Sequence, residues 1–275
     1  MVVMNIAVII PIYKQYSELS PSEKKSLYNT FKILADYVIV FVSPAEIDHS
    51  AYYEGYQDKL HIKKITFPTD YFLDISGYNR LMLSLDFYKK LSEYQYILIC
   101  QLDVFVFSDK LRYFVEKDYD YIGAPWYEGF NTANSESNII GVGNGGFSLR
   151  KVQSFISVLK VLEVFKGSKV SIKQLFAIRN NWSELLHIAK HEYQRRTRDY
   201  ETILPWETNR YEDDYWGRLV KSFFPKFRIS NIEDAISFAF EVNPRVLYKL
   251  NNYELPMGVH AWEKYDPEFW KEFIA

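Results

Sequence analysis

The sequence is poor in the features that mark several classes of protein. Cys100 is its only cysteine among 275 residues, which excludes an intrachain disulfide and a cysteine-based zinc cluster. No apolar run approaches the roughly 20 residues needed to span a bilayer, and the apolar start of the chain lacks the basic segment and the cleavage site of a secretion signal. Glycine and proline are sparse, at 11 and 10 residues. We therefore expect one domain over 1–275 in the cytoplasm, with a peripheral position on the inner face of the membrane left open.

The charge is nearly balanced but unevenly distributed. A net charge of −2 argues against a dedicated nucleic-acid binder, so no nucleic-acid partner is expected. Residues 150–198 nevertheless hold 11 basic and only 3 acidic side chains. This basic segment is either the solvated face of a helix or a surface for an anionic partner, such as membrane phospholipid or a phosphate-bearing acceptor.

Aromatic residues are abundant, with 23 Tyr, 20 Phe and 6 Trp making up 18% of the chain. They indicate either an aromatic core whose tyrosine hydroxyls reach outward or platforms that stack on sugars and bases. Composition alone does not decide between these two interpretations.

The first 105 residues alternate between strand and helix patterns. Four apolar or alternating runs predict strands at Asn5–Ile12, Tyr37–Val42, His61–Phe67 and Tyr96–Cys100. A capping box at Ser20–Glu23 predicts a helix to about Ala35, and a second helix is expected from Asp74 or Ser76 to Leu91. This order is typical of an α/β protein with a mostly parallel central sheet flanked by helices, which binds ligands at the carboxyl ends of its strands.

The remaining residues follow a less regular pattern. A short strand with a sharp turn is predicted at Asp120–Trp126, a mobile loop over 127–140, and a strand that enters a helix at Gly141–Arg150. Residues 151–200 are expected to be mostly helical. A helix is predicted at Glu212–Phe224, a short strand at Phe227–Ser230, and a final amphipathic helix within Leu255–Ala275.

Two residues are candidate metal ligands. Asp103 follows a buried strand at the expected ligand edge, where a carboxylate suits Mn²⁺ or Mg²⁺ bridged to substrate phosphates. His260, between Gly258 and Trp262, could bind the same ion. The alternatives left open are a turn cap for Asp103 and a core histidine for His260.

Three further groups could belong to a binding or catalytic site. Gly143, Gly145 and Gly146, in GVGNGGFSLR, allow positive φ and close backbone approach to a ligand, or else form a tight hairpin. No GK[ST] follows them, so a phosphate-binding P-loop is excluded. The acidic run Glu212-Asp213-Asp214 could hold a general base, or else begin a helix. Arg80 at a predicted helix start could neutralise a diphosphate, or else lie on the surface.

The order of these segments is more informative than any one of them. AVIIPIY, YNRLMLS, YILICQLD, DYIGAPW, VGNGGFSLR, an ED pair and PMGVHAW follow one another along nearly the whole chain. In this order they resemble a family of glycosyltransferases with the GT-A fold, long labelled a domain of unknown function. The most specific parts are VGNGGFSLR and YIGAPW.

The resemblance implies a nucleotide-binding half over 1–110 and an acceptor-side half over 111–275, with a helical basic insertion over 150–200. Its implied donor-binding residues are Pro11, Ile12, Tyr13, Asn79, Arg80, Gln101, Leu102, Asp103, Gly145 and Gly146. Asp103 matches the last residue of the family's DxD motif, which holds Mn²⁺ or Mg²⁺, and His260 would complete that metal site. Gln101 replaces the first Asp, a departure that puts tight metal binding in doubt but allows contact with ribose or sugar.

The resemblance also implies a reaction. Asp213 would be the general base of an inverting transfer, with Asp214 as the alternative if the register slips by one, and Glu212 as the first residue of the ED pair. The donor would be a nucleotide-sugar, with UDP expected, that carries a hexose or N-acetylhexosamine, and the acceptor a glycan or lipid-linked saccharide. A retaining reaction and a non-catalytic glycan-binding scaffold remain alternatives. A sugar nucleotidylyltransferase is disfavoured, because PIYKQYSE after the first strand contains no glycine.

Overall fold

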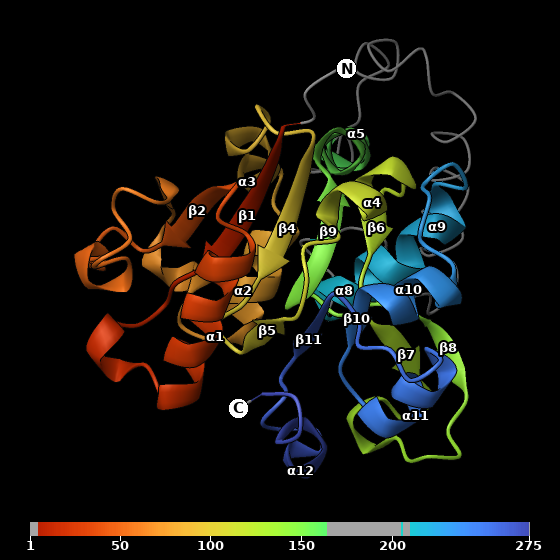
Figure 1. Ribbon diagram of the computed structural model, residues 1–275. Coiled ribbons are helices and arrows are strands. Elements are labelled where there is room, and N and C mark those ends of the chain that lie inside the picture. Colours follow the sequence, from red (N-terminus) through yellow and green to blue (C-terminus); the bar gives the residue numbers. More distant parts are fainter. Residues whose placement is uncertain (1–4, 164–204, 206–209, 275) are drawn as a thin grey trace, which may run out of the picture.

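The computed structural model describes residues 5–163, 205 and 210–274. The part of the predicted basic segment beyond Glu163 lies outside these residues. A six-stranded sheet in the order β3-β2-β1-β4-β9-β6 forms the centre of the molecule (Figure 1). Its strands are β1 (Ile6–Pro11), β2 (Val38–Ser43), β3 (His61–Thr66), β4 (Tyr96–Cys100), β6 (Tyr121–Ile122) and β9 (Phe147–Lys151). Within the described ranges, no helix is long and apolar enough to cross a membrane.

The sheet is mostly parallel because its first four strands are joined by crossovers. β1 pairs in parallel with β2 and β4, and β2 pairs in parallel with β3. β9 is antiparallel to β4 and to β6. All six residues of β1 are buried, as expected for a strand covered on both faces. The predicted α/β class with a mostly parallel central sheet is confirmed.

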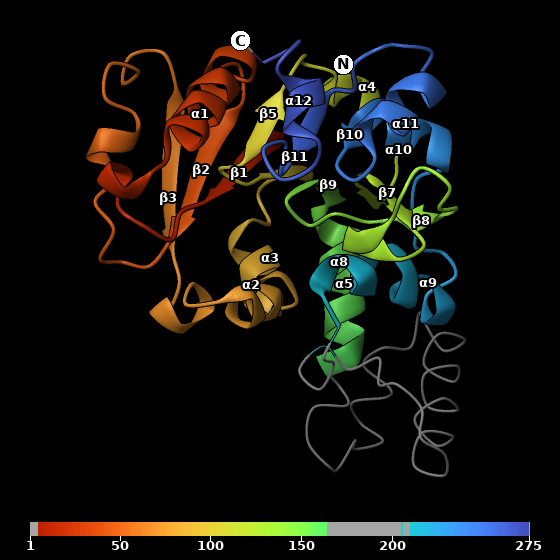
Figure 2. The same cartoon turned by 90° about the horizontal axis from the view of Figure 1, so that it is seen from below.

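Helices cover both faces of this sheet (Figure 2). α1 (Pro21–Ile33) packs on one face, where its Leu27 and Phe31 belong to the same buried cluster as Ile6, Val8 and Ile10 of β1. The helices α2 (Ile75–Met82), α3 (Leu85–Lys90) and α5 (Val152–Glu163) cover the other face. The Ser20 side chain accepts a hydrogen bond from the Glu23 amide in a full capping box, which confirms the predicted helix start.

The single helix predicted to end at Leu91 is wrong, because two helices occupy that stretch. Asp74 caps the N-terminus of α2 by accepting from the Gly77 amide, and α2 ends at Met82. The Ser84 hydroxyl then accepts from the Phe87 amide and begins α3. A serine side chain competes with the helical backbone in this way, and the pattern of apolar residues alone does not reveal it.

A second, three-stranded sheet joins distant parts of the chain. It consists of β10 (Ala239–Phe240), β11 (Gly258–His260) and β5 (Val104–Val106), in the order β10-β11-β5. β11 runs antiparallel to β5, and His260 lies opposite Val104. This pairing brings His260 beside the residue that precedes Val104, which is Asp103.

The irregular half differs most from expectation. The stretch predicted as a mobile loop over 127–140 contains a 3-10 turn at Phe130–Thr132 and the start of β8 (Ile139–Val142), which pairs with β7 (Pro125–Tyr127). Phe227–Ser230 is not a strand and contributes one bridge, between Ile229 and Tyr121. The final helix is only α12 (Pro267–Trp270), because Asp266 caps it and turns follow. Helices that no pattern predicts are α4 (Leu111–Glu116), α10 (Ile232–Phe238) and α11 (Pro244–Leu250).

The acidic run begins a continuous helical segment. It comprises α8 (Glu212–Asp214), a π-helical turn at Tyr215–Leu219, and α9 (Val220–Phe223). The predicted helix at Glu212–Phe224 is therefore present, with one π-turn inside it. Such π-turns occur frequently at functional sites.

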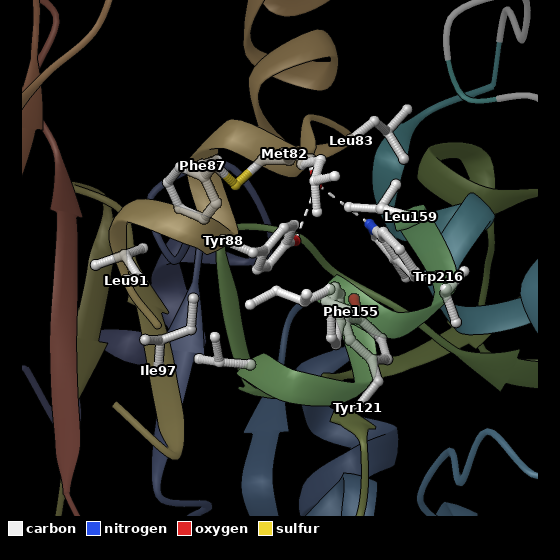
Figure 3. Packing of buried hydrophobic residues seen from close by; sticks show 14 of the residues in the cluster. Met82, Leu83, Phe87, Tyr88, Leu91, Ile97, Tyr121, Phe155, Leu159 and Trp216 are labelled. Atoms are coloured by element: carbon white, nitrogen blue, oxygen red, sulfur yellow. Dashed lines mark hydrogen bonds between the residues drawn. The ribbon is translucent and has the colours of Figure 1, made fainter. Parts of the chain in front are cut away.

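A cluster of buried hydrophobic residues packs the π-helical turn after α8 against α2, α3 and α5 (Figure 3). The Trp216 indole donates to the Met82 carbonyl at 3.3 Å, and the Tyr88 hydroxyl donates to the same carbonyl at 2.9 Å. The ring of Phe155, from α5, lies 4.2 Å from that of Trp216 between centroids. Removing a fully buried ring of this kind typically costs about 3–5 kcal/mol. The cluster therefore fixes the acidic run at the carboxyl edge of the sheet.

Candidate active site

A cleft of about 450 Å³ opens at the carboxyl ends of the parallel strands. Half of the residues that line it were predicted from the sequence: Pro11, Tyr13, Asn79, Gln101, Gly145, Gly146, Glu212, Asp213 and His260. The others are Tyr71, Phe72, Leu73, Asp74, Ile75, Tyr78, Asn144, Tyr211 and Glu241. Segments up to 249 residues apart in the sequence thus meet at the sheet edge where ligands of α/β proteins bind.

The glycine-rich loop packs closely against two side chains of the cleft, Glu212 and His260. A Cβ at Gly145 would lie 1.8 Å from the Glu212 Oε1 atom, and one at Gly146 would lie 2.2 Å from the His260 Nε2 atom. Both positions therefore exclude a side chain. The close approach observed here is to the protein's own side chains, whereas the prediction was of a close approach to a ligand. The predicted positive φ is not at the glycines, since in this loop it occurs at Asn144, with φ of 87°.

Glu212 forms a buried ion pair rather than an open catalytic group. Its Oε1 atom lies 2.9 Å from the Nη2 atom of Arg150, which is fully buried. Arg150 also donates to the Tyr88 hydroxyl at 2.9 Å and to the Ser148 hydroxyl at 3.0 Å. The backbone amide of Glu212 donates to the Asn79 Oδ1 atom at 3.0 Å. Glu212 is thus positioned from both sides, which suits a residue that shapes the cleft.

Asp213 lines the cleft, and backbone amides hold its carboxylate. Its Oδ2 atom accepts from the Gly145 amide at 3.2 Å and its Oδ1 atom from the Asp214 amide at 2.9 Å. Burial, together with the nearby Glu212 and Glu241 carboxylates, raises the pKa of Asp213 to about 7. These backbone hydrogen bonds oppose the shift without cancelling it. A carboxylate with this pKa is suited to general-base catalysis near neutral pH.

A second cleft of about 430 Å³ shares Asp213 with the first. Tyr211 and Glu241 also line both clefts. The residues particular to the second cleft are Pro125, Trp126, Tyr127, Phe130, Asn131, Arg210, Asp214 and Val242. The rings of Trp126 and Phe130 pack edge to face with centroids 4.8 Å apart, so the second cleft has an aromatic wall.

Asp214, the alternative base, is engaged with cations. Its carboxylate pairs with Arg210 and lies 3.4 Å from Arg218. Asp214 lines only the second cleft. Of the two neighbouring aspartates, Asp213 is therefore the one that reaches both clefts.

His260 and Asp103 lie together as predicted. The His260 Nε2 atom lies 3.4 Å from the Asp103 Oδ1 atom and 3.2 Å from the Gln101 Oε1 atom, and His260 Nδ1 lies 2.8 Å from the Glu241 Oε1 atom. Burial opposes a charge on His260, but Asp103 and Glu241 outweigh it and hold the pKa of His260 well above its ordinary value.

These residues fit a divalent cation that also takes ligands from its substrate. In the described ranges, no three His, Cys, Asp or Glu side chains gather as a metal cluster. Asp103 and His260 instead offer one oxygen and one nitrogen, and the Asp103 side chain is 48% exposed. Mn²⁺ and Mg²⁺ are commonly bound by one or two protein groups plus phosphate oxygens. The Glu241 carboxylate holds His260 as outer partners hold metal-binding histidines.

Four predicted donor-binding residues do not line the cleft: Ile12, Arg80, Leu102 and Asp103. Asp103 lies beside the cleft, 3.4 Å from His260, which does line it. The side chains of Ile12 and Leu102 lie in the core beneath the sheet edge. Arg80 lies on the surface, where its guanidinium donates to the Asp70 carbonyl at 3.1 Å and pairs with its carboxylate at 3.5 Å. Because α2 begins at Ile75, Arg80 falls in its last turn, away from the helix start where the prediction placed it.

Sequence reasoning missed Arg150, Glu241 and Tyr78, and it expected Asn144 only to add an amide to the glycine-rich loop. Arg150 and Asn144 belong to VGNGGFSLR, so an arginine directly after the apolar and small residues of a predicted strand was an available signal. Glu241 follows β10, which no pattern predicts. Tyr78 belongs to YNRLMLS but resembles many other tyrosines of this chain.

The sequence profile of one family, described as "Protein of unknown function (DUF5672)", matches residues 61–260. The chain belongs to this family. The part that matches DUF5672 runs from β3 to β11 and includes every cleft residue named above except Pro11 and Tyr13. No match is found among curated proteins.

Several solved structures are similar in fold to this DUF5672 chain. Galactosyltransferase LgtC, in complex with donor and acceptor sugar analogs, is 13% identical over 98% of this chain and 95% of its own, with a TM-score of 0.48. Mouse xyloside xylosyltransferase 1 is 11% identical over 94% and 97%, with a TM-score of 0.47. S. aureus TarS 1-349 in complex with UDP is 17% identical over 58% of this chain, with a TM-score of 0.35. The match covers 49% of that TarS chain, about half its length.

Proposed function

We propose that the protein is a glycosyltransferase that moves a hexose or N-acetylhexosamine from a UDP-sugar to a hydroxyl of a glycan or lipid-linked saccharide. The observation that carries this proposal is the position of Asp213, whose carboxyl lines both clefts and has its pKa raised to about 7. A base at the junction of two clefts can remove a proton from a molecule in one cleft as it attacks a molecule in the other.

In the proposed reaction the larger cleft holds the donor. Pro11, Tyr13 and Tyr71 offer apolar and aromatic surface for the base and ribose. The diphosphate lies toward Gln101 and His260, and the sugar lies toward Gly145 and Asp213. Arg80 has no part in this arrangement, because the structure places its side chain on the surface against Asp70.

The second cleft holds the acceptor. Its aromatic wall, Trp126 and Phe130, suits the apolar face of a sugar ring. The acceptor hydroxyl gives its proton to Asp213 as its oxygen forms a bond to the anomeric carbon. The bond between that carbon and the diphosphate oxygen breaks on the opposite side, and the electron pair leaves with the nucleoside diphosphate. A single displacement of this kind inverts the configuration.

Asp103 and His260 would hold Mn²⁺ or Mg²⁺, which when bound would stabilise the negative charge that develops on the leaving diphosphate. Glu241 fixes the orientation of His260 through the 2.8 Å contact at Nδ1. Gln101 stands beside them in place of a second carboxylate, with its amide oxygen 3.2 Å from His260 Nε2.

A non-catalytic glycan-binding protein is the second candidate, and Gln101 in the place of a carboxylate favours it. A binding protein, however, gains nothing from a partly buried aspartate whose pKa is raised to about 7, because desolvating a carboxylate is costly. A transferase explains the burial of this carboxylate, because a general base that acts near neutral pH needs a pKa raised to that range.

Calorimetry tests the proposal with UDP, GDP, CDP and dTDP, each with Mn²⁺ and with EDTA. We expect micromolar binding of UDP that weakens when the metal is removed. If another of these nucleotides binds instead, the proposed transferase function stands and the donor carries that nucleotide. If none of the four binds, the transferase proposal is wrong and the glycan-binding protein takes its place.

A further inference from the structure

We propose that Tyr78, Asn144 and Glu212 form the subsite that selects the transferred sugar, and that this sugar is uncharged with at least two neighbouring free hydroxyls. This inference rests on the proposed function. It adds the chemical identity of the group that is transferred and the residues that recognise it.

The three side chains share an unusual property. Each lines the larger cleft and each has a buried polar atom with no hydrogen-bond partner among the described residues: Tyr78 Oη, Asn144 Nδ2 and Glu212 Oε2. Asn144 is 1% exposed and Glu212 is 2% exposed. Buried polar atoms are nearly always paired, so an unpaired one needs an explanation. Three such atoms in one cleft are explained by a polar ligand that pairs with them.

The other polar atom of two of these side chains is already engaged. Glu212 Oε1 is held by Arg150 at 2.9 Å, and Asn144 Oδ1 accepts from the Gly146 amide at 3.0 Å. Each group is therefore fixed by one atom and leaves the other for a ligand. Burial raises the pKa of Tyr78, and the nearby Gln101 side chain opposes this shift. The Tyr78 hydroxyl nevertheless has no hydrogen-bond partner among the described residues.

The unpaired atoms define the chemistry of the ligand. An ionised Glu212 Oε2 can only accept a hydrogen bond, Asn144 Nδ2 can only donate one, and the Tyr78 hydroxyl can do both. A sugar hydroxyl is also both donor and acceptor, so neighbouring hydroxyls on one ring can satisfy all three. A fluorine or hydrogen in place of a hydroxyl cannot donate to the carboxylate.

The position and charge of the subsite agree with a reacting sugar. Gly145 lies between Asn144 and Gly146, and its amide donates to Asp213, so the subsite adjoins the proposed base. Glu212, Asp213 and Glu241 place three carboxyl groups around this part of the cleft. Like charges repel in such a partly buried site, so a sugar with its own carboxylate should be rejected.

The test compares UDP with UDP-sugars by calorimetry in the presence of Mn²⁺. The probes are UDP-glucose, UDP-galactose and UDP-N-acetylglucosamine as neutral sugars, UDP-glucuronate as the acidic counterpart of UDP-glucose, and the monodeoxy forms of the tightest binder. If the nucleotide panel selects another base, its corresponding sugars replace these. We expect one neutral sugar to bind more tightly than the bare diphosphate, and at least one deoxy form and the glucuronate to lose that advantage.

Tyr78→Phe is the variant that carries the test, because it removes only an unpaired hydroxyl. Its melting temperature should be unchanged or higher, and its UDP affinity unchanged. The advantage of the sugar over bare UDP should fall roughly 5–100-fold, as for a lost hydrogen bond in a buried site. Tyr94→Phe is the matched control, since it also removes an unpaired buried hydroxyl but from a residue that does not line the cleft. It should change neither affinity.

Glu212→Gln is the second variant. It keeps an oxygen for Arg150 but turns the unpaired acceptor into a donor. The folded variant should therefore also lose the gain in affinity of the UDP-sugar over UDP. The inference is wrong if Tyr78→Phe keeps the full gain in affinity of the UDP-sugar over UDP, or if UDP-glucuronate binds as tightly as UDP-glucose. Neither result would contradict the proposed transferase function. Failure of every nucleoside diphosphate to bind would overturn both.

Discussion

The two clefts that meet at Asp213 are built in different ways. The larger one lies at the carboxyl ends of β1 and β4, and its polar groups come mainly from α2, the glycine-rich loop, α8 and β11. The second is lined by β7, the strand that pairs with β8, and has a wall of aromatic side chains. This difference agrees with the proposed reaction, in which the first cleft binds the donor and the second binds the acceptor.

The difference also separates two kinds of recognition. Charged and unpaired polar atoms in the first cleft give direction-dependent hydrogen bonds, which discriminate strongly between similar ligands. Stacking on Trp126 and Phe130 depends less on substituents of the ring. Substitutions in the first cleft should therefore have larger effects than those in the second.

The largest effect is expected for Asp213→Asn, which removes the base shared by both clefts. Transfer should fall by about 10² or more, in line with the usual contribution of a general base, while UDP affinity stays near normal. Single-turnover kinetics and calorimetry measure the two quantities. Asp86→Asn, an exposed carboxylate on α3, is the control. Unchanged turnover in Asp213→Asn would remove Asp213 from the mechanism.

Gly145→Ala should also disable turnover. Its Cβ would lie 1.8 Å from Glu212 Oε1, so Glu212 and the neighbouring Asp213 must move. A displacement of about 1 Å at a reacting group can cost about 10²-fold in rate. Gly141→Ala is the matched control, because a Cβ there would meet only ordinary contacts at 3.5 Å. Equal rates in the two variants would show that the close approach at Gly145 has no catalytic role.

Asp103→Ala should weaken nucleotide binding only when the metal is present. Loss of an outer-shell partner typically costs roughly 10–100-fold in metal affinity, and a direct ligand should cost at least as much. Calorimetry with UDP in Mn²⁺ and in EDTA separates the two conditions. An identical loss in both would mean that Asp103 does not act through a metal.

The smallest effect is expected in the second cleft, for Trp126→Ala. A stacked ring contributes about 0.5–1.5 kcal/mol beyond the area it buries, so the KM for an acceptor glycoside should rise roughly 3–10-fold. UDP affinity should not change. Tyr113→Ala, a half-exposed aromatic on α4, provides the control. A larger effect on UDP than on the acceptor would reverse the assignment of the two clefts.

Half of the residues that line the first cleft were predictable from the sequence, because those residues belong to segments with local signals. Apolar runs end at Pro11 and Cys100, glycines gather at 143–146, and carboxylates gather at 212–214. Parallel strands bring such segments to one edge. Asp103 and His260 were expected to lie together, both as candidate ligands of one ion and from the resemblance. The β5–β11 pairing that brings them together has no local signature in the sequence.

The rest depends on contacts that no local pattern encodes. The split between α2 and α3 depends on one hydrogen bond of Ser84, and the position of Arg80 follows from where α2 begins. The second cleft needs β7 and β8 to pair across a stretch that was predicted to be a loop. Short strands are stabilised mainly by what they pack against, so the sequence of that stretch could not reveal them.

The most direct test of the account is the pH dependence of UDP-sugar turnover. Asp213 acts as a base only when it is deprotonated, so its raised pKa means that kcat/KM should fall about tenfold per pH unit below pH 7 and level off above it. The residual turnover of Asp213→Asn should lose this acidic limb. A limb near pH 4, where an ordinary aspartate titrates, or the same limb in Asp213→Asn, would contradict the assignment of Asp213 as the base between the two clefts.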